Sequence, residues 1–167
     1  MSNDLLNRRA DSFILWSPHQ PVAPPALVIG EFQEGTPPTL ANERRFDLKP
    51  VAGVSGLWSV QAADCGLKDG QFYHYWFEVE NTLPGHANPR ILVCDPLTLA
   101  TDWRLVSGNQ PSAVVAFAQG KLVPCDPDGG GVTDPQVGPM GALPTNNQMV
   151  IYRIALRLDP PTAWRRH

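Results

Sequence analysis

Short apolar segments separated by turn-forming residues limit the fold of this chain more than any other feature. The segments cover residues 12–16, 26–32, 45–51, 57–62, 71–80, 90–94, 113–118 and 149–156. None of them keeps the 3.6-residue period of an amphipathic helix, and several are rich in β-branched or aromatic residues. Gly, Pro and Asp cluster between them, in a chain that holds 18 Pro and 14 Gly. This pattern predicts short strands joined by turns.

The strand pattern predicts an all-β fold, an immunoglobulin-like two-sheet β-sandwich with a Gly/Pro-rich C-terminal extension. About seven strands with a turn signal every ten residues or so are typical of that architecture. We expect an N-terminal tail at 1–11, the sandwich at 12–118 and a linker at 119–148, where few side chains are apolar. The apolar run in 149–167 then reads as a docking strand or the start of a truncated catalytic barrel, in a natural polypeptide that continues.

Charge and composition exclude several classes of partner. The formal net charge is −3 and no Lys/Arg cluster is present, so we expect no nucleic-acid partner. No stretch has the length and hydropathy of an export signal or a membrane span, so we expect a cytoplasmic protein without a membrane partner. Three cysteines cannot all pair within the chain and lack paired zinc-ligand spacing, which predicts reduced thiols. We therefore expect no metal and no other cofactor.

The segment DGQFYHYWFEVE, residues 69–80, carries the densest group of aromatic residues. Successive side chains of a strand point to opposite faces, which divides this segment into two rows. The first row contains Tyr73, Tyr75, Phe77 and Val79, and we expect it to be core. The second row contains Phe72, His74, Trp76 and Glu78. We expect Trp76 either to cover a neighbouring domain or linker, or to serve as a platform for a sugar ring.

Five motifs in order give the chain a resemblance to a known family. They are FILWSP followed by ALVIGEF, then GLW, GQFYHYWF, the Asp-Pro turn CDPLT, and MVIYRI. Together they resemble the N-terminal β-sandwich of glycoside hydrolase family 13 enzymes such as pullulanases and glycogen branching and debranching enzymes. That sandwich is called carbohydrate-binding module family 48. The resemblance covers residues 12–105, and MVIYRI is similar to the strand that opens the catalytic barrel of the family.

The resemblance implies a non-catalytic accessory domain of an enzyme that acts on α-glucans such as glycogen, starch or maltooligosaccharides. Glycoside hydrolysis needs two carboxylates across the scissile bond, and the family carries them on barrel strands that this chain does not reach. This chain is therefore not expected to be an enzyme. Its expected partner is the catalytic domain of the same polypeptide, with α-glucan as a second one. The alternatives are a free-standing glycan-binding module and a protein-interaction sandwich unrelated to carbohydrate.

Candidate site residues follow from the strand rows and from the resemblance. For carbohydrate we consider Trp76, Phe72 and His74, which share one face of the predicted strand. For contact with the catalytic domain the resemblance implies Asp95, Trp103 and Arg104, in the stretch just past the sandwich. We expect no catalytic residue and no metal ligand. The positions of Trp16 and Trp58 resemble the folding signature of the family, and we expect both indoles to pack in the core.

The aspartates are the remaining acidic candidates, and they fall in contexts typical of turns. They are Asp95, Asp102, Asp126, Asp128 and Asp134. Asp is favoured near Pro and Gly because its carboxylate accepts hydrogen bonds from the backbone two residues on. We therefore expect these side chains to hold local backbone rather than to form a paired catalytic site.

Overall fold

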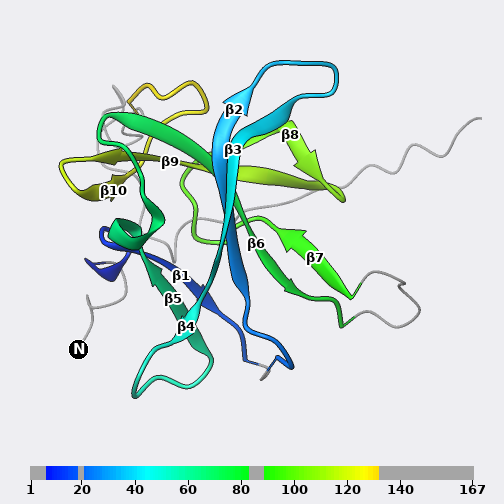
Figure 1. The fold of residues 1–167 in the computed structure, drawn as a ribbon, viewed down its shortest axis with the longest axis vertical. Coiled ribbons are helices and arrows are strands. Elements are labelled where there is room, and N and C mark those ends of the chain that lie inside the picture. Colours follow the sequence, from blue (N-terminus) through cyan, green and yellow to red (C-terminus); the bar gives the residue numbers. More distant parts are fainter. Residues whose placement is uncertain (1–6, 19–20, 83–88, 132–167) are drawn as a thin grey trace, which may run out of the picture. The chain divides into compact units, whose positions relative to one another are not determined.

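The structure, a computed structural model, describes residues 7–18, 21–82 and 89–131. The chain divides into a compact unit, Met1–Val132, and a second unit, Thr133–His167. The predicted strand at 149–156, Asp134 and most of the predicted linker lie outside the described residues. The described residues of the first unit are drawn in colour in Figure 1.

The first unit is built of antiparallel strands, as the spacing of apolar segments predicts. The strands are β1 (Ser12–Trp16), β2 (Ala26–Gln33), β3 (Thr39–Asp47), β4 (Lys49–Pro50), β5 (Leu57–Gln61), β6 (Gln71–Glu80), β7 (Arg90–Val93), β8 (Thr101–Ser107), β9 (Gln110–Ala118) and β10 (Lys121–Val123). A single 3-10 turn, η1 (Ala62–Cys65), joins β5 to β6 within this described part. In the described residues, no helix is both long and apolar enough to cross a membrane.

The strands form two sheets that pack as a sandwich. The larger sheet runs β10-β9-β6-β2-β3, with β7 paired to β6 and β8 paired to β9, and the smaller runs β1-β5-β4 (Figure 1). The chain changes sheet between β1 and β2, between β3 and β4, and between β5 and β6, so it crosses between the layers three times in this stretch. The fold is therefore the predicted all-β, two-sheet sandwich.

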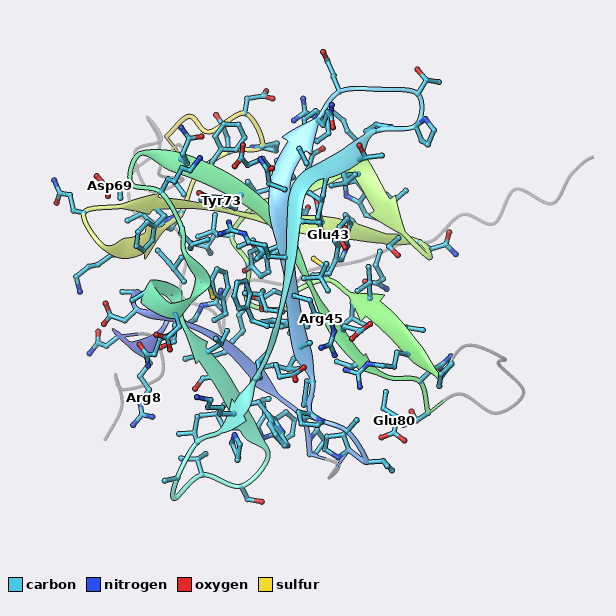
Figure 2. The ribbon with its side chains drawn as sticks, in the orientation of Figure 1. Arg8, Glu43, Arg45, Asp69, Tyr73 and Glu80 are labelled. Carbon is cyan, nitrogen blue, oxygen red and sulfur yellow. The ribbon has the colours of Figure 1, made fainter. Side chains whose placement is uncertain are left out.

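Strand β6 lies in the middle of the larger sheet and supplies the core. Tyr73, Tyr75 and Phe77 are each at most 2% exposed, as predicted for the first row. The Tyr75 ring meets Phe13 of β1 edge-on at 5.0 Å between centroids, a contact that joins the two sheets. Figure 2 shows Tyr73 among side chains inside the fold, while the side chains of Arg8 and Glu80 lie at its periphery.

The second row of β6 is also covered. His74 is fully buried and Trp76 is 4% exposed, while Phe72 and Glu78 are half-buried. The indole Nε1 of Trp76 donates a hydrogen bond to the carbonyl of Gln110 at the start of β9. A central strand has neighbours on both edges, and here loops and adjacent strands also cover the face opposite the core. Trp76 therefore packs within its own unit.

One strand, one predicted boundary and one predicted core residue differ in the structure. Strand β8 lies inside the predicted sandwich at 12–118, but no predicted apolar segment covers it. Strand β10 extends the larger sheet past residue 118 into the predicted linker, because Leu122 is buried in the core cluster. Trp58 packs partly against the core as expected. Trp16 does not: it is 64% exposed, because Leu15 before it faces the core and the last residue of β1 points away.

Candidate functional site

Asp95 is a buried anchor for the segment that follows β7. Its carboxylate is 3% exposed and accepts three hydrogen bonds: Oδ1 from the Leu97 amide at 2.8 Å, and Oδ2 from the Tyr75 hydroxyl at 2.8 Å and from Arg9 Nη2 at 3.1 Å. Burial, together with the charge of Asp95, raises the pKa of Tyr75 well above its ordinary value. The Asp-Pro turn is thereby tied to the central strand.

The role expected for Asp95 as an inter-domain contact is therefore corrected. A carboxylate that is 3% exposed and already accepts three hydrogen bonds cannot also reach a neighbouring domain. Asp95 instead has a structural role. Its hydrogen bond from the Leu97 amide fixes the backbone turn, and this turn sets the direction of the residues that follow. Arg9, in the predicted N-terminal tail, was missed by the sequence reasoning, since nothing in the pattern connects position 9 with position 95.

The segment after Asp95 exposes apolar side chains. Leu97, Leu99, Trp103 and Val106 are 56%, 74%, 68% and 52% exposed, and they make up four of the seven large apolar side chains exposed in the described part. We call these four residues the β8 patch. Trp103 and Val106 belong to β8, which pairs with β9 through a register shift between Asp102 and Val106. Trp103 is thus exposed, as an inter-domain anchor has to be.

A second polar centre lies on the opposite face of β6. His74 Nε2 is 3.0 Å from Asp102 Oδ2, and the two side chains are 0% and 3% exposed. Burial lowers the pKa of His74 and outweighs the opposing effect of Asp102. The neutral imidazole then donates from Nε2 to the carboxylate, which leaves Nδ1 buried with no hydrogen-bond partner among the described residues.

Arg104 completes this centre. Its guanidinium contacts both oxygens of Asp102 at 2.8 to 3.0 Å, and the Arg104 amide donates to Oδ1 of the same side chain. Burial alone would raise the pKa of Asp102, but the hydrogen bonds from Arg104 and His74 outweigh it and hold that pKa below its ordinary value. Asp102 therefore stays ionised inside the fold. The expectation of a purely local backbone role for it was incomplete.

Arg104 also holds the loop that follows β10. Its Nη2 is 2.8 Å from Asp128 Oδ1 and donates to the carbonyl of Pro127, while the guanidinium lies 4.7 Å from the centre of the Phe32 ring. Arg104 Nε and Nη2 and its flat face are thus engaged within the unit, but the side chain is 43% exposed, so its expected inter-domain contact stays a prediction. Asp126 accepts from the amides of Asp128 and Gly130, so it has the local backbone role predicted for it.

The candidate carbohydrate row does not present a ring. His74 and Trp76 are buried, and Phe72 lies against Gly129 of the loop, where an added Cβ would come within 2.4 Å of the ring. A sugar stacks only on an aromatic face that it can reach. His74 and Trp76 therefore belong to a packed interior, and Phe72 is half-buried beside the loop. No sequence pattern connects Phe72 with this loop, because the loop lies more than fifty positions away.

The buried His74 and Asp102 pair does not extend to a nucleophile in the described residues. Ser112 is the adjacent hydroxyl, and its Oγ donates to the backbone carbonyl of Asp102 at 3.3 Å rather than to the imidazole. No group of three or more His, Cys, Asp or Glu side chains that could hold a metal ion is present in that part of the chain. The three cysteines are free, and burial raises the pKa of Cys65 and Cys125 to about 11.

In comparisons with known proteins, no family model matches this chain, and no curated protein or solved structure matches it either.

Proposed function

We propose that this chain is a non-catalytic accessory β-sandwich of a glycoside hydrolase that acts on α-glucans, and that the β8 patch packs against the catalytic domain of the same polypeptide. The observation that carries the proposal is the concentration of exposed apolar side chains on one short segment. Leu97, Leu99, Trp103 and Val106 follow one another within ten positions, and all are more than half exposed. Large exposed apolar side chains concentrated on one segment of a domain favour an interaction site there.

The construction of that segment gives further support. Asp95 fixes its beginning to β6, and Asp102 fixes its middle through His74 and Arg104. Buried polar anchors on both sides hold the apolar side chains outward on a rigid support, which lowers the entropy lost when a partner binds. Trp103, an exposed large ring flanked in sequence by Asp102 and Arg104, is of the residue type enriched among interface anchors.

The test compares two exposed apolar residues in the polypeptide that the full reading frame encodes. Trp103→Ser lies in the β8 patch, and Val22→Ser, at a residue that is 93% exposed, lies outside it. We expect Trp103→Ser to increase protease cleavage between this unit and the following domain, while Val22→Ser has no effect. A reading frame without a glycosidase barrel, or equal effects of the two substitutions, would contradict the proposal.

A free-standing glycan-binding module is the second candidate, and one observation favours it. The indoles of Trp16 and Trp103 are 64% and 68% exposed, so each can offer a face to a sugar ring. Titration of the isolated chain with maltoheptaose, followed by tryptophan fluorescence, separates the two functions. The accessory role predicts no saturable change at millimolar sugar. A saturable change that Trp103→Ser or Trp16→Ser removes would establish glycan binding instead.

A further inference from the structure

A cavity of about 260 Å³ lies beside Arg9 and Asp95. Its walls come from the chain before β1, from β1, from the turn after β7, and from β9 and the end of β10, and most of the lining side chains are apolar. An engineered apolar cavity of roughly 150 Å³ is enough to hold a benzene molecule, and natural ligand sites begin near roughly 300 Å³. This cavity therefore has room for one ring or a short chain.

The polar groups of the cavity are balanced in charge but not in hydrogen bonding. Arg9 is the one cation and Asp95 the one carboxylate among its described lining residues. Asp95 accepts three hydrogen bonds, whereas Arg9 makes one, to Asp95, and its Nη1 is buried with no acceptor among the described residues. A buried donor without an acceptor loses the hydrogen bonds it had in water. Among the described residues, Arg9 Nη1 thus lacks an acceptor, while the charges of Arg9 and Asp95 balance.

We propose that this cavity binds a small uncharged molecule that has an apolar ring or chain and one carbonyl oxygen, with Arg9 as the hydrogen-bond donor. The apolar part fills the space between β1 and β9. Arg9 lines the cavity and its side chain is 23% exposed, so a change of rotamer brings an unpaired N–H group to the ligand oxygen. An anionic ligand would add a charge beside Asp95, and the described lining residues hold no second cation to balance it. This inference does not rest on the proposed function.

Three probes of similar size test the proposal on the isolated chain: acetophenone, ethylbenzene and benzoate. Acetophenone has a ring and a carbonyl, ethylbenzene lacks the acceptor, and benzoate replaces the neutral acceptor with a charge. Binding is followed by chemical-shift changes of backbone amides. We expect acetophenone to bind about tenfold more tightly than either of the others, which is the size of effect that one hydrogen bond to a charged donor gives.

Two substitutions locate the binding. Arg9→Met keeps the length of the side chain and removes the donors, so acetophenone should fall to the affinity of ethylbenzene. Val123→Trp places a ring in the cavity from β10 and should abolish binding of both. Circular dichroism checks that each variant is folded. If Arg9→Met does not fold, the comparison of the three probes on wild type and the Val123→Trp variant still test the proposal. Three results would overturn the proposal: acetophenone binding that does not saturate, tighter binding of benzoate than of acetophenone, or unchanged binding in Val123→Trp.

Discussion

Two tryptophans of the larger sheet, on strands that both pair with β9, illustrate how burial assigns roles at the level of single residues. Trp76 on β6 is 4% exposed, and Trp103 on β8 is 68% exposed. We predict that Trp76→Ala lowers the free energy of unfolding by about 3 to 5 kcal/mol, as truncation of a large core ring does. Trp103→Ala should change it by about 0.5 kcal/mol or less, as at an exposed site. Urea unfolding measures both, and similar losses for the two variants would contradict the assignment.

His74 makes the stability depend on pH. Its pKa is lowered by burial from the ordinary value of 6.5, so the folded state binds this proton less tightly than the unfolded chain does. Above the pKa that His74 has in the unfolded chain, neutral His74 contributes its full stabilisation. As the pH falls from that pKa towards the lower pKa of the folded state, this stabilisation is lost. Asp102, whose pKa is also lowered, adds a loss in the same direction only in stronger acid.

The prediction is a fall in the free energy of unfolding of wild type as the pH drops below the ordinary His pKa of 6.5, with a slope that approaches about 1.4 kcal/mol per pH unit until the folded pKa is reached. His74→Phe keeps a ring between Phe32 and Phe72 and removes the titrating group. Its unfolding free energy should fall less over the same range. An equal pH dependence in both proteins would show that another group is responsible.

At the scale of elements, the loop after β10 is held against β6 by close packing. Gly129 has φ +83°, and a Cβ there would come within 2.4 Å of the Phe72 ring. Gly120, in the turn between β9 and β10, has φ +76° and nothing within 4 Å of the same position. Both glycines have a left-handed backbone, in which a residue with a Cβ is strained. They differ in whether a Cβ at that position would meet another atom.

This pair yields a matched prediction. Gly120→Ala should lower the free energy of unfolding by about 1 to 2 kcal/mol, the cost of a left-handed residue with a Cβ. Gly129→Ala should lower it by about 1 to 3 kcal/mol more, because the methyl group overlaps a ring. The measurement is again urea unfolding. Equal losses would mean that the loop moves away from Phe72 without cost.

The elements that sequence patterns predict well are those in which alternation and turn residues agree. β1 and β6 lie at the predicted positions, because each is an unbroken apolar or aromatic run between turn signals. β8 has no such run: Asp102 and Arg104 lie inside it, and the register shift breaks its alternation. β10 is only three residues long and follows a Gly turn, so its composition is that of a connector.

The candidate site was less predictable than the strands, since its contacts join distant parts of the chain. His74 meets Asp102 across 28 positions, and Arg9 meets Asp95 across 86. Alternation places His74 on a face of β6 but does not say what covers that face. The resemblance to family 13 sandwiches pointed to the stretch from 95 to 104. Within it the structure separates Trp103, which is exposed, from Asp95 and Arg104, which hold the stretch in place.

At the scale of the whole described unit, the question is whether the two sheets unfold together. Cys65, at the end of η1, lies where the chain passes from the smaller sheet to the larger one. It belongs to the core cluster, and Arg44 of β3 donates to its carbonyl oxygen at 2.8 Å. Burial raises the pKa of its thiol to about 11, so the folded protein offers little thiolate for alkylation.

We predict that iodoacetamide labels Cys65 only through global unfolding, so that the free energy of opening from labelling rates agrees with the value from urea within about 0.5 kcal/mol. Peptide mass spectrometry resolves the three thiols. Cys94, which is half-buried and follows β7, should react faster and serves as the internal control. If Cys65 instead opens at a clearly lower free energy, the smaller sheet separates from the larger one before the larger one unfolds. The two sheets would then differ in stability, and the contact between Phe13 and Tyr75 would be too weak to make them unfold together.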